Sequence, residues 1–217
     1  MAKQPADRAS EAMADEHALP SKRDIDRCRR CPLWKDATQG VPGQGPPSAR
    51  ILLVGEQPGD EEDQQGEPFV GPAGRLLRRA LDDAKLAASE IFLTNAVKHF
   101  GWIPRGPRRI HKTPTQREIA ACLDWLEAEI AALRPRVIVA LGATALSALM
   151  GKRTTIREAR AASLRHGSGA VIIASYHPSA ALRAPDEAMQ REIYQALLAD
   201  LVRARQLLAS DDLQTTV

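Results

Sequence analysis

The chain has 217 residues, 44% of them hydrophobic, and a formal net charge of +3 at pH 7. This length and composition suffice for one hydrophobic core, which favours a single folded domain. The sequence has no run of about 18 apolar residues and no apolar stretch near its start, which excludes a membrane span and a secretory signal. We therefore expect a cytoplasmic protein that does not bind membranes.

The first feature along the chain is a polar segment, residues 1–22, predicted to be a flexible tail. Cys28 and Cys31 follow it, and Cys122 lies far downstream. Three cysteines in a cytoplasmic chain of this length favour metal ligands over disulfides. A single Cys-x-x-Cys pair on its own fits zinc, a redox pair or no function.

Four apolar runs predict strands at 51–54, 91–94, 137–141 and 171–174. They show little alternation, which is typical of strands that are covered on both faces. Helical patterns fall at 73–85, 115–133, 143–150 and 187–207. This alternation predicts one α/β domain over residues 23–209, a three-layer α/β/α fold with a central four-stranded parallel sheet. Residues 210–217 are predicted to form a second flexible tail.

A basic segment, residues 98–112, follows the second predicted strand and is interpreted as a surface loop because of its prolines and glycines. From Ile91 to Arg117 there is no acidic residue, whereas six Lys or Arg residues lie between Lys98 and Arg117. Such a field favours a polyanion, and nucleic acid is the natural candidate. The segment contains His111, whose imidazole can act as an acid, a base or a nucleophile, or can contact phosphate.

Polar side chains follow three of the four predicted strands. In parallel α/β folds the chemistry gathers at the carboxyl ends of the strands. Glu56, Gln57 and Asp60 follow the first strand, Asn95 ends the second, and His177 follows the fourth. The Gly55–Gly59 turn also resembles a phosphate loop, but it lacks the full glycine-rich pattern.

The ordered motifs resemble those of the uracil-DNA glycosylase superfamily, its iron–sulfur family 4 branch in particular. They are Gly55-Glu56-Gln57-Pro58-Gly59, Pro68-Phe69-Val70-Gly71-Pro72-Ala73-Gly74, Thr94-Asn95-Ala96-Val97-Lys98 and His177-Pro178-Ser179. The resemblance runs from about Cys28 to Leu201. Arg108-Arg109-Ile110-His111 further resembles the UdgX branch, which joins itself covalently to uracil-containing DNA; Pro107 stands where that branch commonly has a lysine.

This resemblance implies uracil and uracil-containing DNA as partners, with single-stranded DNA expected over duplex, and a monomer associated with the bacterial nucleoid when bound to DNA. It also implies a 4Fe–4S cluster. Its ligands would be Cys28, Cys31, His99 and Cys122, so that a histidine stands in place of the usual fourth cysteine. Two alternatives stay open: His17 as the fourth ligand with His99 contacting phosphate, and zinc as the metal.

The expected pocket follows from what uracil presents. Phe69 offers a ring for stacking, and the amide of Asn95 matches the N3–H and O4 groups of uracil, a pattern that cytosine reverses. His177 is expected to donate a hydrogen bond to uracil O2 as negative charge develops on the leaving base. Gln57 and Asp60 are also expected to contact uracil. Without the resemblance, a Phe such as Phe69 is more often a core residue and an Asn such as Asn95 more often a cap, and His177 has the alternative of packing before a turn-forming proline.

His111 has two interpretations. A histidine among arginines usually contacts phosphate, yet surrounding positive charge also favours the neutral ring with a free lone pair. The UdgX resemblance implies that this ring attacks C1′ of the deoxyribose and stays attached. Glu56, Gln57 and Asp60 are candidates to stabilise the cationic sugar, position water or orient His111. Arg109, Lys112 and Arg183 are expected to contact DNA, and Arg109 also suits an anchor for the loop.

Three hypotheses remain: a single-turnover uracil-DNA glycosylase that becomes crosslinked through His111, a turnover glycosylase that uses water, and a non-catalytic iron–sulfur module that binds nucleic acid. The catalytic hypotheses assign roles to Glu56, Gln57, His111 and His177.

Overall fold

The computed structural model describes residues 18–152 and 154–214, with side chains described up to residue 210. Its central sheet has five strands in the order β2–β1–β5–β7–β6. They are β1 (Ile51–Gly55), β2 (Ile91–Asn95), β5 (Val137–Leu141), β6 (Leu164–Arg165) and β7 (Val171–Ser175). The four predicted strands are parallel, as expected. The prediction of only four strands is wrong, because β6 adds a short antiparallel edge beside β7.

The four predicted helices are all present. They are α3 (Pro72–Asp83), α4 (Gln116–Leu133), α5 (Ala143–Met150) and α8 (Glu187–Gln214). The start of α4 is fixed by a capping box, in which Thr115 accepts from the backbone N–H of Glu118 and the Glu118 carboxylate accepts from that of Thr115. Helix α8 continues past residue 209, into the segment predicted as a tail. Residues 1–17 and 215–217 of the predicted tails lie outside the described residues.

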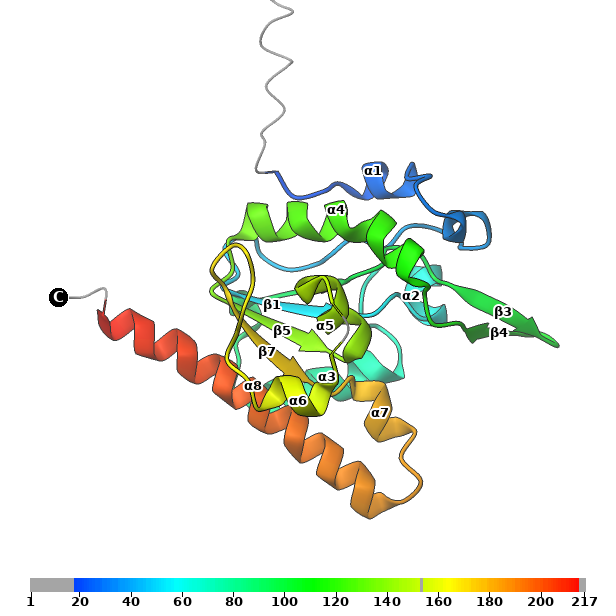
Figure 1. Ribbon diagram of the computed structural model, residues 1–217. Helices are drawn as coiled ribbons and strands as arrows, with labels where there is room; N and C mark the ends of the chain where they lie inside the picture. The colour runs from blue at the N-terminus through cyan, green and yellow to red at the C-terminus, as the bar shows by residue number, and fades with distance from the viewer. Residues whose placement is uncertain (1–17, 153, 215–217) are drawn as a thin grey trace, which may run out of the picture.

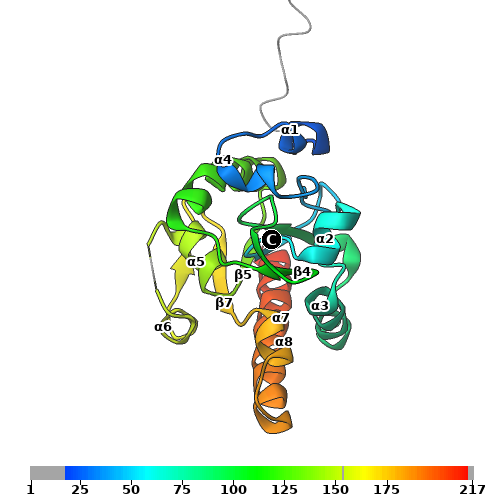
Figure 2. The ribbon, with the colours of Figure 1, turned by 90° about the vertical axis from the view of Figure 1, so that its right-hand side faces the viewer.

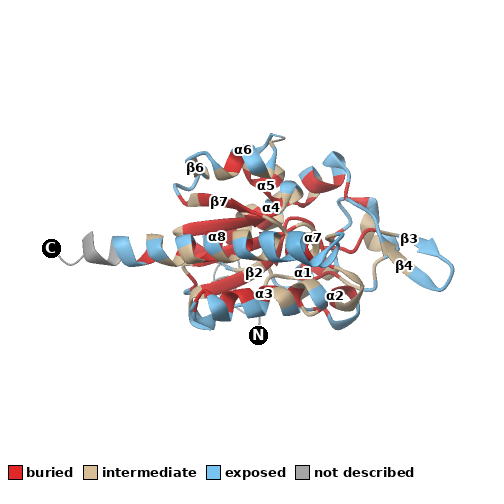
Figure 3. Ribbon diagram, turned by 90° about the horizontal axis from the view of Figure 1, so that it is seen from below, coloured by how far each residue is buried: buried red, intermediate tan, exposed pale blue. Residues whose placement is uncertain are grey.

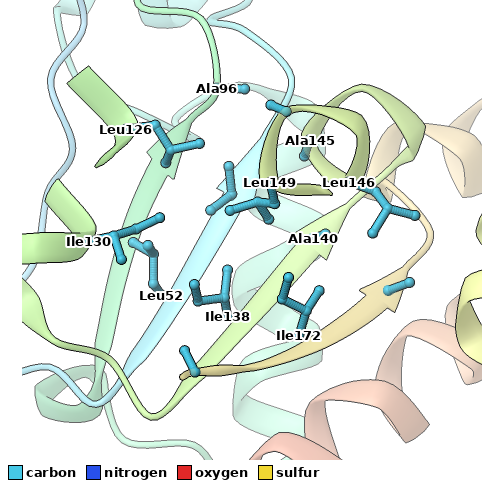
Figure 4. Packing of buried hydrophobic residues seen from close by; sticks show 14 of the residues in the cluster. Leu52, Ala96, Leu126, Ile130, Ile138, Ala140, Ala145, Leu146, Leu149 and Ile172 are labelled. Carbon is cyan, nitrogen blue, oxygen red and sulfur yellow. The ribbon is translucent and has the colours of Figure 1, made fainter. Parts of the chain in front are cut away.

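Helices cover both faces of the sheet (Figures 1 and 2). One core cluster packs Leu52, Ile138 and Ile172 against α4 and α5, and Figure 4 shows its side chains between the sheet and these helices. The second cluster packs Leu53 and Val139 on the opposite face against α3 and α8. The fold is therefore the predicted three-layer α/β/α domain.

Several short elements surround this core. The N-terminal arm contains α1 (Lys22–Asp26) and the 3-10 helix η2 (Pro32–Lys35), and η3 (Ala88–Glu90) precedes β2. Three short helices, α2 (Asp60–Gln65), α6 (Ile156–Arg160) and α7 (Pro178–Leu182), lie near the carboxyl ends of the parallel strands. Glu62 and Asp63, two carboxylates of the acidic run 60–63, are buried in α2.

The basic segment forms an antiparallel hairpin, β3 (Trp102–Arg105) and β4 (Arg108–His111), rather than the irregular loop predicted. It extends away from the body of the domain and is mostly exposed at its tip (Figures 1 and 3). Its turn is closed by Gly106, whose φ of +58° lies in the left-handed region that glycine adopts without strain.

In the part of the chain that the structure describes, every helix is too short or too polar to cross a membrane.

Candidate active site

A cavity of about 790 Å³ opens at the carboxyl ends of the parallel strands. Polar residues from several elements line it: Glu56 and Gln57 after β1, Asp60 on α2, Asn95 at the end of β2, His111 at the end of β4, and His177 and Arg183 at the two ends of α7. The sheet thus brings together most of the predicted site residues, at the edge where parallel α/β folds place their ligands.

Glu56 and His111 form the central pair of this cavity. Nε2 of His111 lies 3.2 Å from Oε1 of Glu56, and the other carboxylate oxygen accepts a short hydrogen bond from the hydroxyl of Thr144. Burial raises the pKa of Glu56, but the hydrogen bonds from His111 and Thr144 outweigh it and leave this pKa below its ordinary value. Glu56 is therefore ionised at neutral pH and fixed on both sides.

His111 sits at the base of the hairpin, which a clamp from Gln57 fixes. The Gln57 side-chain amide donates 3.0 Å hydrogen bonds to the carbonyl oxygens of Gly101 and Lys112. Its own oxygen accepts a 3.2 Å hydrogen bond from the backbone N–H of Gly101. The side-chain amide of Gln57 is thus occupied by hydrogen bonds to the two ends of the hairpin, and it is not free to bind a ligand in the pocket.

Arg109 points back into the protein. Its guanidinium pairs with Asp60 at 2.5 Å and with the fully buried Asp63 at 2.6 Å, and it lies over the rings of Phe100 and Trp102. Despite burial, which lowers it, the pKa of Arg109 is raised by these two carboxylates. Arg109 is thus the anchor of the hairpin, and Asp60, which lines the cavity, is partly occupied in holding it.

Only part of the positive charge counted between Lys98 and Arg117 is free to attract an anion. Lys98, one of the six basic residues counted in the sequence, is wholly buried and pairs with Glu129 at 2.7 Å. Arg105, Arg108, Lys112 and Arg117 are the remaining basic residues, and all four are exposed. The field that an anion meets therefore comes from the hairpin tip and the segment after His111.

His177 follows β7 and caps the N-terminus of α7. Its Nδ1 accepts a 3.2 Å hydrogen bond from the backbone N–H of Ser179. Burial lowers the pKa of His177 to about 4, the positive neighbours Arg183 and His111 acting in the same direction against Glu56. The ring is therefore neutral at pH 7, and because Nδ1 accepts, Nε2 carries the hydrogen. His177 is a neutral donor that lines the cavity.

Phe69 and Asn95 form the inner end of the cavity. Both are buried, and a methyl group on Gly55 would lie 2.7 Å from the ring of Phe69 and 2.3 Å from the oxygen of Asn95. Phe69 has a φ of +58°, a left-handed conformation that costs a bulky residue roughly 1–3 kcal/mol and is typical of functional sites. Its ring lies at 27° to that of His177, with centroids 6.3 Å apart.

Asn95 is only 3% exposed, and it lines the cavity. A side-chain amide at such a place can both donate to and accept from a polar ligand. The structure therefore places a ring surface and an amide where a planar, polar molecule would enter.

Lys112 and Arg183 lie at opposite sides of the site. Lys112 follows the hairpin and is exposed, and Arg183 ends α7 and lines the cavity. Both are available to an anion at the mouth of the cavity, and their contact with DNA stays a prediction.

The cysteines gather between the N-terminal arm and α4. All three are buried and free; Cys28 accepts a 3.3 Å hydrogen bond from the indole of Trp125, and Cys31 contacts Cys122. The hydrogen bond from Cys122 lowers the pKa of Cys31 to about 7, a value compatible with a thiolate ligand. The predicted fourth ligand, His99, is also buried, and burial lowers the pKa of its ring.

Within the described residues, no three or more His, Cys, Asp or Glu side chains are grouped closely enough to hold a single metal ion. The donor set of three buried thiols and a buried imidazole fits the chemistry of an iron–sulfur cluster, which takes thiolates and, in some centres, imidazoles. His17, the alternative fourth ligand, lies outside the described residues.

The sequence reasoning missed Thr144, Tyr176 and Ile156, which all line the cavity. Thr144 lies three residues after the predicted third strand, so its place near a strand end was a usable signal. Ile156 begins α6, a five-residue helix too short to predict from its pattern. No sequence pattern distinguishes Tyr176 from an ordinary turn residue.

Comparisons with known proteins agree with this site. The profile of the uracil DNA glycosylase superfamily matches residues 42–201. A type-4 uracil-DNA glycosylase of Thermotoga maritima is 37% identical over 86% of this chain and 92% of its own length. One of Pyrobaculum aerophilum is 39% identical over 74% of this chain and 82% of its own. A type-5 uracil-DNA glycosylase of Thermus thermophilus is 33% identical over 71% and 84%.

Proposed function

This chain belongs to the uracil-DNA glycosylase superfamily and is a family 4-like uracil-DNA glycosylase, and we propose that it completes the reaction with His111 instead of water. The protein would then end each reaction joined to the deoxyribose, as in the UdgX branch. The observation that carries the proposal is the contact between Nε2 of His111 and the ionised Glu56, at the rim of the cavity.

Uracil binding is assigned to the inner end of the cavity. The ring of Phe69 stacks on the base, and the amide of Asn95 pairs with its N3–H and O4 groups. The place of this amide on the wall of the cavity beside Phe69 supports the assignment, and cytosine would present a donor to its donor and an acceptor to its acceptor. Asp60 and Gln57 are expected close to the base, although their side chains are engaged with the hairpin.

Cleavage of the C1′–N1 bond leaves its electron pair on uracil. The neutral Nε2–H of His177 donates a hydrogen bond to uracil O2 as this charge develops. The lowered pKa keeps this ring neutral at pH 7, and a neutral imidazole does not give up its N–H near neutral pH, so His177 stabilises the anion by a hydrogen bond without transferring a proton. Glu56 stabilises the positive charge that develops on the sugar.

The covalent step then balances without another reactant. The C1′–N1 bond breaks first and its electron pair leaves with uracil, and the lone pair of one ring nitrogen of His111 then forms the bond to C1′ of the cationic sugar. The imidazole becomes positively charged, and Glu56 beside it takes up the ring proton, which passes on to the departing base or to solvent. The product is an N-glycosidic bond with a poor leaving group, so hydrolysis does not release the protein.

A turnover reaction with water is the second candidate. Glu56 lines the cavity and is ionised, so it can also orient a water molecule toward C1′. The similarity to type-4 uracil-DNA glycosylases favours uracil excision equally under both candidates. Only the fate of the sugar distinguishes them.

We further propose that Cys28, Cys31, His99 and Cys122 hold a 4Fe–4S cluster. Such a cluster supplies a structural crosslink and, through the imidazole, a higher reduction potential than four thiolates give. It would join the N-terminal arm to α4 and to the segment that leads into the hairpin. We also propose that the protein acts on single-stranded uracil-containing DNA, because the narrow hairpin suits one strand better than a duplex. We propose further that the protein is a monomer.

The test mixes the protein with a labelled single strand that contains one uracil, followed by denaturing gel electrophoresis. A band shifted by the mass of the protein, resistant to heat and detergent and absent for His111→Ala, supports attack by His111. His166→Ala is the matched control, because His166 is an imidazole bound to a glutamate on another part of the molecule. Free abasic strand accumulating beyond one equivalent of protein would instead establish turnover with water.

A further inference from the structure

The hairpin carries an apolar strip that belongs to neither core cluster. Ile103 is 50% exposed, one of three large hydrophobic side chains exposed among the described residues. It pairs with Ile110 across the hairpin, and directly opposed residues lie on the same face. Ile110 lines the cavity. The strip therefore runs across the hairpin from the cavity wall at Ile110 to the exposed side chain of Ile103.

Positive charge continues this strip. Arg105 and Arg108 are opposed at the end of the hairpin, and the two-residue alternation of a strand puts them on the face of Ile103 and Ile110. Both are exposed, and neither forms an ion pair within the described part of the chain. An aliphatic surface followed by two guanidinium groups matches the chemistry of a nucleotide, which has an apolar base face and an anionic phosphate.

We propose that the Ile103–Ile110 strip binds the nucleobase next to the flipped uridine in the same strand, and that Arg105 and Arg108 bind the phosphates beyond it. The inference rests on the proposed function, which brings C1′ of the flipped nucleotide to His111 at the base of the hairpin. The adjoining nucleotide is one phosphodiester away, so it lies against the part of the hairpin between His111 and the tip. The strip thus makes excision depend on a neighbouring base, whatever completes the reaction.

The experiment measures uracil release from three single strands under protein excess, at protein concentrations below saturation. One strand is normal, and the others carry a tetrahydrofuran abasic residue directly 5′ or directly 3′ of the uridine, which removes a base but keeps every phosphate. With the wild-type protein, one of the two modified strands should react about fivefold more slowly than the normal strand. The readout does not require a crosslink, so it survives failure of the covalent step.

The Ile103→Thr variant tests whether the side chain of Ile103 is the contact to the neighbouring base. Threonine keeps the β-branched shape that favours a strand while removing apolar contact. This variant should release uracil from the normal strand about fivefold more slowly and show no further loss on the modified strand. Met189→Thr is the matched control: Met189 is 42% exposed on α8, and this variant should keep the wild-type sensitivity.

Three outcomes overturn the inference: a wild-type protein equally fast on all three strands, an Ile103→Thr variant that stays sensitive to the missing base, and a Met189→Thr variant that loses sensitivity as well. Sedimentation of both variants tests a second copy as the occupant; a monomer–dimer equilibrium that Ile103→Thr abolishes would also overturn it. If the wild-type protein releases no uracil from any strand, the proposed function itself has failed.

Discussion

The hydroxyl of Thr144 helps to keep the carboxylate of Glu56 ionised. The hydrogen bond from Thr144 favours the ionised carboxylate, so Thr144→Val should raise the pKa of Glu56. Because the reaction needs ionised Glu56, the acidic limb of the rate–pH profile should move to higher pH. The rate at neutral pH should fall by roughly threefold to tenfold, as expected for one lost hydrogen bond.

The measurement is the rate of uracil release between pH 4.5 and pH 8, at saturating protein. Thr144→Ser keeps the hydroxyl and should restore both the rate and the position of the limb. If Thr144→Val lowers the rate equally at every pH, Thr144 only fills space and does not tune Glu56.

His177 provides a second test at this scale. Burial holds its pKa at about 4, so the ring should stay neutral at pH 6, where a free imidazole is largely protonated. Two-bond proton–nitrogen correlation spectra should show the Nε2–H tautomer down to about pH 5, with the signal assigned by its loss in His177→Asn. A ring that titrates near pH 6.5 would contradict the neutral donor.

Among the elements, the hairpin is the one whose position depends on a few polar contacts. Asp63→Asn keeps the shape of the buried side chain but removes the charge that Arg109 contacts at 2.6 Å. Loss of a buried charge partner costs several kcal/mol, so the hairpin should loosen and formation of the crosslink should slow by at least tenfold. Uracil release should fall less, since Phe69 and Asn95 lie on other elements.

Single-turnover assays that follow both products measure this difference. Glu187→Gln is the control, because Glu187 pairs with Arg191 on the surface of α8 and neither residue lines the cavity. Equal losses of release and crosslinking in Asp63→Asn would mean that the whole domain, and not the hairpin, is perturbed.

The tip of the hairpin makes a separate prediction about salt. If Arg105 and Arg108 contact phosphates, each change to alanine should reduce the dependence of log K on log salt by about 0.7 for a single strand. Arg203→Ala is the control, because this exposed arginine lies on α8, away from the cavity. Fluorescence anisotropy over a series of KCl concentrations gives the slopes, and unchanged slopes for Arg105→Ala and Arg108→Ala would contradict the phosphate contacts.

The long elements were predictable because their patterns are strong. The buried strands show apolar runs such as Val137–Leu141, and the Thr115 and Glu118 pair marks the start of α4 in the sequence. The hairpin was not predictable, since Pro104, Gly106 and Pro107 are ordinary loop residues and only pairing across the turn makes them strands. The same limit applies to α2, where burial of Asp63 depends on a partner, Arg109, 46 residues away.

The candidate site was predictable to the extent that it lies at strand ends. Asn95, His177 and Glu56 come from three strand ends, and parallel topology brings them together. The sequence did not reveal that Gln57 holds the hairpin or that Arg109 turns inward, because both depend on contacts between distant segments.

For the whole molecule, the cysteine region is the connection between the arm and the rest of the domain. If Cys28, Cys31, His99 and Cys122 hold a cluster, protein purified without oxygen should contain about four iron atoms, and His99→Ala should lower that number. His99→Cys should keep the iron and lower the reduction potential, since a thiolate donates more charge than an imidazole. Iron content and voltammetry measure these effects; full iron content in His99→Ala would exclude His99 as a ligand.

The clamp from Gln57 has a consequence for how such a protein can arise and be redesigned. The backbone N–H of Lys112 donates a 2.9 Å hydrogen bond to the carbonyl oxygen of Gly101, and the amide of Gln57 spans the same two residues. The ends of the ten-residue hairpin are therefore already adjacent, and neither core cluster contains a residue from between them. Removing or transplanting the hairpin leaves the scaffold a short gap to close. If His111 captures the sugar as proposed, a single insertion is therefore enough to add this step to a scaffold that already excises the base.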